Sequence, residues 1–211
     1  MEVQREESGR ALWAVLTATV LFLAAAEHAA PADTPEASPS LSGQLLVAMP
    51  SLDDPRFKRT VVYMLVHDAR GAMGLIMNRP LGDIPIAVLL KQAGLPEAGV
   101  KGMVKLHVGG PVEATRLSVL HSDDYRGPET TMLAGGLAVT SQPDILGAIA
   151  AGKGPRRTHF SVGFAGWGPG QLEGEIKGGY WITVPADEGI LFDDAYETKW
   201  DRAMAKRRIS L

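Results

Sequence analysis

The sequence predicts an α+β domain whose sheet is mostly antiparallel and strongly curved. Three observations favour this class. Short segments rich in Val and Leu recur along residues 41–211, segments with helical spacing are few, and the two kinds do not alternate as they do in regular βαβ folds. No repeat of fixed period is visible. We therefore expect a single domain with a few flanking helices.

The first half of this domain is expected to contain three strands, a break and a helix. The second and third strands are joined by Asp-Ala-Arg-Gly at residues 68–71, which favours a hairpin. Pro80 and Pro85 interrupt the strand pattern, and Gly94 and Pro96 end the helical spacing that follows. The expected strands are 44–49, 60–67 and 72–77, and the expected helix is 86–93.

The middle of the domain is expected to add two strands and one helix. Strands over 105–108 and 117–121 are joined through Gly109, Gly110 and Pro111. The helix is expected over 144–151, with Ser141 as its N-cap, Pro143 in its first turn and Gly152 beyond its end.

The segment 163–187, GFAGWGPGQLEGEIKGGYWITVPAD, is expected to form a tight corner. Its glycines suit a backbone that turns through positive φ or approaches another surface closely. Trp167 and Trp181 are expected to clamp the corner from either side. The elements expected here and beyond are strand 160–165, turn 166–170, helix 171–177, strands 180–184 and 189–192, and helix 197–207.

Residues 1–40 have the composition of an appendage to the domain 41–211. Residues 11–26 form an uncharged apolar run, and residues 27–40 form a spacer rich in Pro, Ala, Ser and acids. The run has the length of a signal-peptide core and falls short of the roughly 20 residues that span a bilayer. We expect segment 1–26 to direct export to the periplasm, with cleavage before Glu27.

Two other interpretations of this segment stay open. Residues 1–10 carry three acids and two arginines, whereas an export signal is usually positive here, so an uncleaved membrane anchor is an alternative. A buried helix of the fold is a weaker one. Cytoplasmic residence would follow if the segment does not direct export.

Charge and cysteine content exclude several classes of function. Residues 1–40 hold six acidic and two basic residues, which leaves 18 acidic and 19 basic residues in 41–211. A nearly neutral domain lacks the broad positive surface on which most DNA affinity rests. The one dense basic cluster, residues 206–208, is expected in the last turn of the final helix. No cysteine is present, which excludes disulfides, thiolate nucleophiles and cysteine-based metal sites.

Two glycine-rich segments resemble phosphate-binding loops but depart from the pattern. In GAIAAGKG, Gly154 stands where Ser or Thr is required, and the segment ends a helix instead of opening one. In GWGPG, the third glycine comes one place early and Pro169 has no amide to donate. A structural corner is therefore the favoured interpretation. An anion on the amides of Gly170 and Gln171 is the weaker alternative.

Candidate acid–base groups are scattered in the sequence. Glu173 and Glu175 diverge on a helix, and Glu173 is expected to pair with Lys177 instead. The acid pairs 53–54 and 193–194 are expected to act in turns and caps. His67, His107 and His121 fall at strand ends without metal-ligand spacing. We therefore expect no catalytic residue, resident metal or cofactor.

Several motifs together resemble the YqgE/AlgH family over about residues 41–211. They are AMPSLDDPRFKRTVVYMLVHD, GAMGLIMNRPL, VGGPVEATRLSVLHS and GFAGWGPGQLEGEI followed by YWITVPAD. The resemblance implies an α+β fold with a flattened, barrel-like sheet and flanking helices. The family is usually labelled as a candidate transcriptional regulator, but it is unlike any standard DNA reader and implies no catalytic residues. Leu117-Ser118 replaces a Gly-Phe that is common in the family, and members are typically cytoplasmic.

Three functional hypotheses follow. The first is a non-enzymatic binding or regulatory module that holds a small ligand or a protein partner on a rim of glycine-rich loops. The second is a DNA-linked regulator that uses residues 206–208, and the third is a hydrolase that uses His67 or His121 with Asp123, Asp193 or Asp194. Membrane contact is expected only through residues 11–26, if they are not cleaved. The rim residues are Asn78, Arg79, Gly109, Gly110, Gly168, Gly170 and Gln171.

Overall fold

The computed structural model describes residues 39–207, which belong to one compact unit. The expectations for segment 1–26 and for most of the spacer lie outside the described residues. Within residues 39–207, no helix combines the length and the apolar character that are needed to cross a bilayer.

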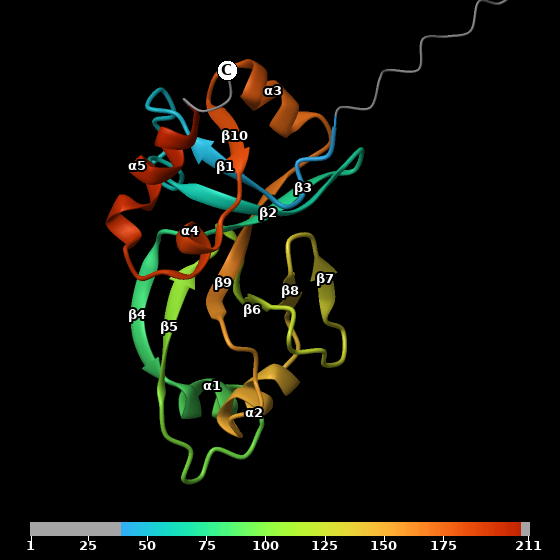
Figure 1. Ribbon diagram of the computed structural model, residues 1–211, viewed down its shortest axis with the longest axis vertical. Coiled ribbons are helices and arrows are strands. Elements are labelled where there is room, and N and C mark those ends of the chain that lie inside the picture. Colours follow the sequence, from blue (N-terminus) through green and yellow to red (C-terminus); the bar gives the residue numbers. More distant parts are fainter. Residues whose placement is uncertain (1–38, 208–211) are drawn as a thin grey trace, which may run out of the picture. The chain divides into compact units, whose positions relative to one another are not determined.

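A curved, mostly antiparallel sheet forms the framework of the described chain (Figure 1). Its main path runs in the order β10-β1-β2-β3-β9-β6-β8-β7, and β5 joins it through β9 with β4 at its outer side. The strands are β1 (Gln44–Ala48), β2 (Val61–Asp68), β3 (Gly71–Ile76), β4 (Pro80–Pro85), β5 (Met103–Val108), β6 (Val112–Ser122), β7 (Thr131–Leu133), β8 (Leu137–Thr140), β9 (Thr158–Trp167) and β10 (Trp181–Pro185). This architecture confirms the predicted fold class.

Strand β9 connects the two halves of the sheet. Its first half pairs with β5 and β6, and Ala165, Gly166 and Trp167 pair with β3. Between these halves, Gly163 has a φ of +70°, and a Cβ there would lie 2.4 Å from the Gly110 carbonyl oxygen. The strand bends where only glycine permits both the backbone conformation and the close contact.

Helices cover the sheet in three places, each over its own apolar cluster. Helices α4 (Glu188–Phe192) and α5 (Tyr196–Lys206) pack on Leu45, Val47 and their neighbours, and α3 (Gln171–Lys177) packs with Leu46 and Ala48 on the opposite face. Helices α1 (Ile86–Gln92) and α2 (Asp144–Ala150) cover Val119 and Phe160. Because successive residues of β1 point to opposite faces, one short strand contributes to two clusters.

Two predicted elements differ from the structure. The predicted break at 80–85 is wrong: it is the strand β4, whose prolines are tolerated because β4 lies at the outer side of β5. The predicted strand 189–192 is the helix α4, which begins where the Asp187 carboxylate accepts the N–H of Ile190. A short apolar run does not distinguish strand from helix, and the cap decides here.

The hairpin β7–β8 was not predicted from the sequence, and β6 is longer than expected. The expected N-cap at Ser141 is also wrong. Pro143 occupies the N-cap position of α2 without a side-chain cap, and the Ser141 hydroxyl contacts the Ser118 hydroxyl at 3.0 Å.

The glycine-rich corner is formed as predicted, with α3 between β9 and β10. The rings of Trp167 and Trp181 meet edge to face with centroids 5.9 Å apart, and both indole N–H groups donate to the same Glu175 oxygen, at 2.9 and 2.8 Å. The expected pair of Glu173 with Lys177 is wrong, because Glu173 contacts His67 Nε2 at 3.0 Å instead. Both acids of α3 thus fix the helix to the sheet.

Candidate functional site

An open groove of about 490 Å³ lies where the loop before β2, the segment between β3 and β4, and the first turns of α5 meet. Its charged lining consists of three cations, Lys58, Arg59 and Arg79, and one acid, Glu197. We call this feature the cationic groove. The rest of its lining is Pro55, Asn78, Pro80, Tyr196 and Trp200.

Asn78 fixes the shape of the loop that carries two of the cations. Its side-chain oxygen accepts the N–H of Val61 at 3.0 Å, and its amide nitrogen donates to the Arg59 carbonyl at 2.9 Å. Arg59 lies between these contacts with a φ of +55°, which is rare for a residue with a side chain. A strained residue that its surroundings hold in place is a common feature of functional sites.

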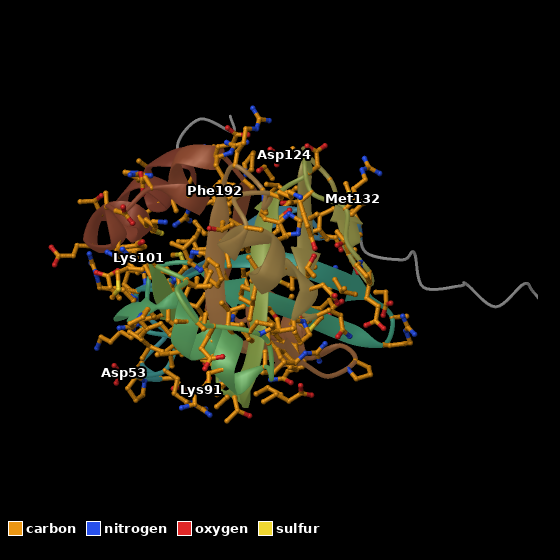
Figure 2. All side chains as sticks on the ribbon, turned by 90° about the horizontal axis from the view of Figure 1, so that it is seen from below. Asp53, Lys91, Lys101, Asp124, Met132 and Phe192 are labelled. Carbon is orange, nitrogen blue, oxygen red and sulfur yellow. The ribbon has the colours of Figure 1, made fainter. Side chains whose placement is uncertain are left out.

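The three cations differ in how far they are already neutralised. Lys58 pairs with Asp53 at 2.8 Å, and Asp53 lies at the edge of the domain with its side chain directed to solvent (Figure 2). Arg59 pairs with Asp201 at 3.0 Å, again on the surface. Exposed pairs of this kind contribute little and exchange readily with a ligand. Arg79 donates to the Lys58 carbonyl at 2.6 Å, and no carboxylate of residues 39–207 pairs with it.

Two aromatic side chains of α5, Tyr196 and Trp200, also line the groove. Trp200 is anchored by its indole N–H, which donates to the Ala48 carbonyl at 2.7 Å, and the Arg59 guanidinium lies 4.0 Å from its ring centroid. Tyr196 donates its hydroxyl to Asp194. Burial and this acidic neighbour raise the pKa of Tyr196, so its hydroxyl stays protonated at neutral pH.

Buried polar groups lie behind Tyr196. The rings of His107 and His159 stack with centroids 3.9 Å apart, and His107 lies 5.0 Å from the Tyr196 ring. Burial lowers the pKa of His107, and that of His159 falls well below its usual range. Burial also lowers the pKa of Lys199 to about 8, although Asp193 opposes the shift. None of the three lines the groove.

The predicted rim is divided in the structure. Asn78 and Arg79 line the cationic groove. Gly109 and Gly110 are buried, and the Gly109 amide donates to the Val162 carbonyl at 2.8 Å, so it is not available to a ligand. The corner residues lie beyond Trp167, which pairs with Ala72 at the start of β3, whereas Asn78 follows the end of that strand. Six residues of strand, roughly 20 Å, separate the two parts.

In the corner, one of the two amides expected to bind an anion, that of Gln171, has an internal partner. The N–H of Gly168 donates to the Gln171 side-chain oxygen, and the N–H of Gln171 donates to the Gly168 carbonyl, both at 3.1 Å. Gly170 supplies the left-handed residue before α3. The geometry therefore favours a structural role for this loop.

The acid–base pairs considered from the sequence do not form. His121 bonds to the Ser122 carbonyl and the Thr140 hydroxyl, and His67 contacts the Leu41 N–H and Glu173. Both nitrogens of each ring are thus engaged by groups other than Asp123, Asp193 or Asp194. We therefore abandon the hydrolase hypothesis on these residues.

The remaining acid and base clusters have structural partners. Asp53 and Asp54 pair with Lys58 and Arg56, while Asp193 pairs with Arg202. Within the range that the structure describes, no three His, Cys, Asp or Glu side chains are arranged to hold a metal. Lys206 pairs with Asp187, and Arg208 lies outside the described residues.

Sequence reasoning found Asn78 and Arg79 but missed Lys58, Arg59, Tyr196 and Trp200. The motif RFKRT contains two of the missed cations, and their density before a strand was the available signal. Nothing in the spacing of the sequence shows that α5, more than a hundred residues away, completes the groove.

The fold and groove define an α+β domain with a curved half-barrel sheet. The profile of the AlgH-like family matches residues 45–211, and the chain belongs to this family. It is similar to a UPF0301 protein of Caulobacter vibrioides, with 45% identity over 172 residues, 81% of this chain and 88% of that protein. The UPF0301 protein Rru_A3059 of Rhodospirillum rubrum is 44% identical over 166 residues, 79% of this chain and 86% of that protein.

Two solved structures share this fold. The solution structure of the AlgH protein from Pseudomonas aeruginosa matches with a TM-score of 0.70 and 40% identity, over 82% of this chain and 91% of that one. The crystal structure of protein DIP2367 from Corynebacterium diphtheriae matches with a TM-score of 0.61 and 24% identity, over 79% and 86% of the two chains, and shares the fold.

Proposed function

We propose that this protein is a non-enzymatic binding module that holds an anionic small molecule in the cationic groove. The observation that carries the proposal is the convergence of Lys58, Arg59 and Arg79 on one open cavity, with Arg79 free of any carboxylate partner among residues 39–207. A guanidinium in this state is suited to a phosphate or carboxylate, because its planar N–H groups match two anion oxygens at once.

The size and walls of the groove define the ligand class further. A volume of about 490 Å³ lies within the range of roughly 300–1,000 Å³ that is typical of small-molecule sites. Tyr196 and Trp200 offer flat apolar surface beside the cations. A molecule with a phosphate or carboxylate at one end and a planar or apolar body at the other would use both features.

The surroundings of the groove support binding more than catalysis. The groups with strongly lowered pKa values, His159 and Lys199, are buried behind Tyr196 and do not reach the cavity lining. A general base must come within hydrogen-bond reach of the proton that it removes. A ligand in the groove would therefore meet cations, aromatic rings and the Glu197 carboxylate, but neither His159 nor Lys199.

A thermal-shift screen of the full chain against phosphates, carboxylates and nucleotides tests the proposal. We expect anions to raise the melting temperature, because a ligand that binds only the folded state stabilises it. Arg79→Ala should abolish the shift. Arg70→Ala removes the same charge from the β2–β3 turn and should leave the shift intact. If no anion stabilises the wild type, or if both variants respond equally, the proposal is wrong.

The DNA-linked hypothesis has a simpler test. This hypothesis expects the basic residues 206–208 to contact DNA, and one of them, Lys206, is already paired with Asp187. Fluorescence anisotropy with random duplex DNA at low salt gives phosphate contacts their greatest strength. Binding that is lost in Lys206→Ala would favour a regulator on DNA over a small-molecule module.

A further inference from the structure

Two further cavities lie next to each other and share part of their lining. One, of about 420 Å³, lies between the helices α1 and α2 and strand β6, and we call it the helical lobe. The other, of about 380 Å³, lies between β3 and the β7–β8 hairpin, and we call it the hairpin lobe. Arg116, Ser141 and Gln142 line both cavities. The two lobes therefore share a polar waist.

The backbone of β6 is distorted to form this waist. The pairing of β6 with β9 is interrupted between Val112 and Leu117, so the intervening residues leave the ladder. Glu113, at the start of the interruption, has a φ of +46°. Bulges of this kind re-aim side chains beside functional sites, and a non-glycine residue at positive φ is costly unless its surroundings hold it. The distortion presents Arg116 to both cavities.

The lining of the helical lobe is mainly apolar, with a few uncharged polar side chains such as Gln92, Thr115 and Thr140. Of its described lining residues, Arg116 alone is charged. The walls are side chains from α1, α2 and the sheet, among them Leu89, Leu117, Val119, Ile145 and Leu146. An apolar cavity with one cation at its rim is complementary to a molecule with an alkyl body and one negative charge.

Hydrogen-bond donors at the waist outnumber the partners that the protein supplies. Ser118 and Ser141 share one hydrogen bond between their hydroxyl oxygens, and because two hydroxyls carry two protons, one proton remains available. Arg116 donates one N–H to Glu113 at 3.1 Å, and both side chains of this pair are about half exposed. A guanidinium has five N–H donors, so four remain. The unused donors suit an anion.

The carboxylates near the waist indicate which lobe would accept the alkyl body of an anionic ligand. Glu129 lines the hairpin lobe and accepts from Gln142, whereas the helical lobe has no carboxylate among its described lining residues. Glu113 pairs with Arg116 at the surface, and an exposed pair of this kind is weak enough to be replaced. A ligand whose anionic head lies at the waist would therefore place its alkyl chain in the helical lobe.

We propose that the waist and the helical lobe form a binding site for an alkyl-chain monocarboxylate. The carboxylate accepts from Arg116 and from the free hydroxyl proton of the Ser118–Ser141 pair, and the alkyl chain lies against α1 and α2. This site shares no lining residue with the cationic groove, so the two proposals stand or fall separately.

Titration of the full chain with decanoate and with 1-decanol, followed by methyl chemical shifts, tests the site. Decanoate should bind more tightly than decanol. Arg116→Ala should weaken decanoate by about tenfold or more, as expected for loss of a charge-assisted contact, and leave decanol nearly unchanged. Arg70→Ala removes the same charge from the β2–β3 turn, lines none of the three cavities, and should change neither affinity.

A second variant tests the lobe itself. Ala93 lines the helical lobe at the C-cap of α1 and is only partly buried, so Ala93→Met should occupy the cavity without disrupting the core. We expect it to weaken both ligands while the melting temperature stays near that of the wild type. The proposal is overturned if decanoate does not bind, if Arg116→Ala affects the two ligands equally, or if Ala93→Met leaves both affinities intact.

Discussion

Asn78 shows how one side chain can organise a binding loop. Its amide closes two backbone contacts, to Val61 and Arg59, across the base of the cationic groove. The sequence directed attention to Asn78 and Arg79 as part of a rim that was expected to include the glycine-rich loops. It could not show that Asn78 holds the loop while Arg79 contacts the Lys58 carbonyl, because both contacts depend on a loop that reaches this segment only in the folded chain.

We predict that Asn78→Ala lowers the free energy of unfolding by about 2 kcal/mol, because it removes two side-chain to backbone hydrogen bonds. Urea denaturation measures the change. Asn78→Asp keeps the acceptor for Val61 but cannot donate to Arg59, so it should retain part of the stability. Equal stability of the wild type and the alanine variant would show that the two Asn78 hydrogen bonds do not stabilise the fold.

The stacked pair of His107 and His159 gives a second prediction at this scale. Burial holds both pKa values below the usual 6.5, so the unfolded chain takes up protons that the folded chain resists. Stability contributed by the neutral rings is therefore present above pH 6.5 and is lost as the pH falls below it. Urea denaturation at pH 7.5 and 5.5 should show this loss.

The matched variant carries His107→Gln and His159→Gln together. It should show a weaker decline in stability between the same two pH values, because the two titrating groups are gone. The account of the pair is contradicted if the wild type and the variant decline in parallel.

At the scale of elements, local signals predicted the helices and strands that carry strong patterns. The helix over 171–177 agrees with α3, and the hairpin of β2 and β3 is present. Errors arose where tertiary pairing or a helix cap decides the structure. Residues 80–85 become a strand only because β5 lies beside them, and residues 189–192 become a helix through the Asp187 cap. The hairpin β7–β8 is short, and β7 has three residues of which two are exposed, so its pattern is weak.

The link between β5 and β6 gives the clearest prediction for an element. Gly110 has a φ of +154°, and an added Cβ would lie 2.1 Å from the Phe164 carbonyl carbon. Gly110→Ala should therefore lower stability by about 3 kcal/mol or prevent folding. Gly174 lies in α3 with no atom within 4 Å of an added Cβ, so Gly174→Ala should raise stability by about 0.5–1 kcal/mol. Thermal melting of the two variants checks both predictions. Similar changes in melting temperature for Gly110→Ala and Gly174→Ala would contradict the close contact at Gly110.

At the scale of the whole molecule, family membership and fold agree with the resemblance found in the sequence. The candidate site agrees only in part, because α5 and the loop before β2 are brought together by the sheet. We propose anions as ligands of both sites, one through several cations and the other through one cation beside a mainly apolar cavity. A domain with nearly balanced charge can concentrate its cations in this way.

The compartment is a prediction for the full chain. The apolar run 11–26 and the spacer that follows favour export. We expect a C-terminally tagged chain, expressed in its host, to appear in the exported fraction with a mature N-terminus near Glu27. An intact N-terminus in the soluble cytosolic fraction would defeat the export proposal, and an intact N-terminus in membranes would favour an anchor.

The central claim is that the cationic groove, and not the glycine-rich corner, holds an anion. Backbone amide chemical shifts during a titration with phosphate, and then with citrate, test it most directly. We predict that the largest changes fall on Lys58, Arg59 and Arg79 and that they disappear in Arg79→Ala. Changes centred on Gly168, Gly170 and Gln171, or no saturable change with either anion, would contradict the claim.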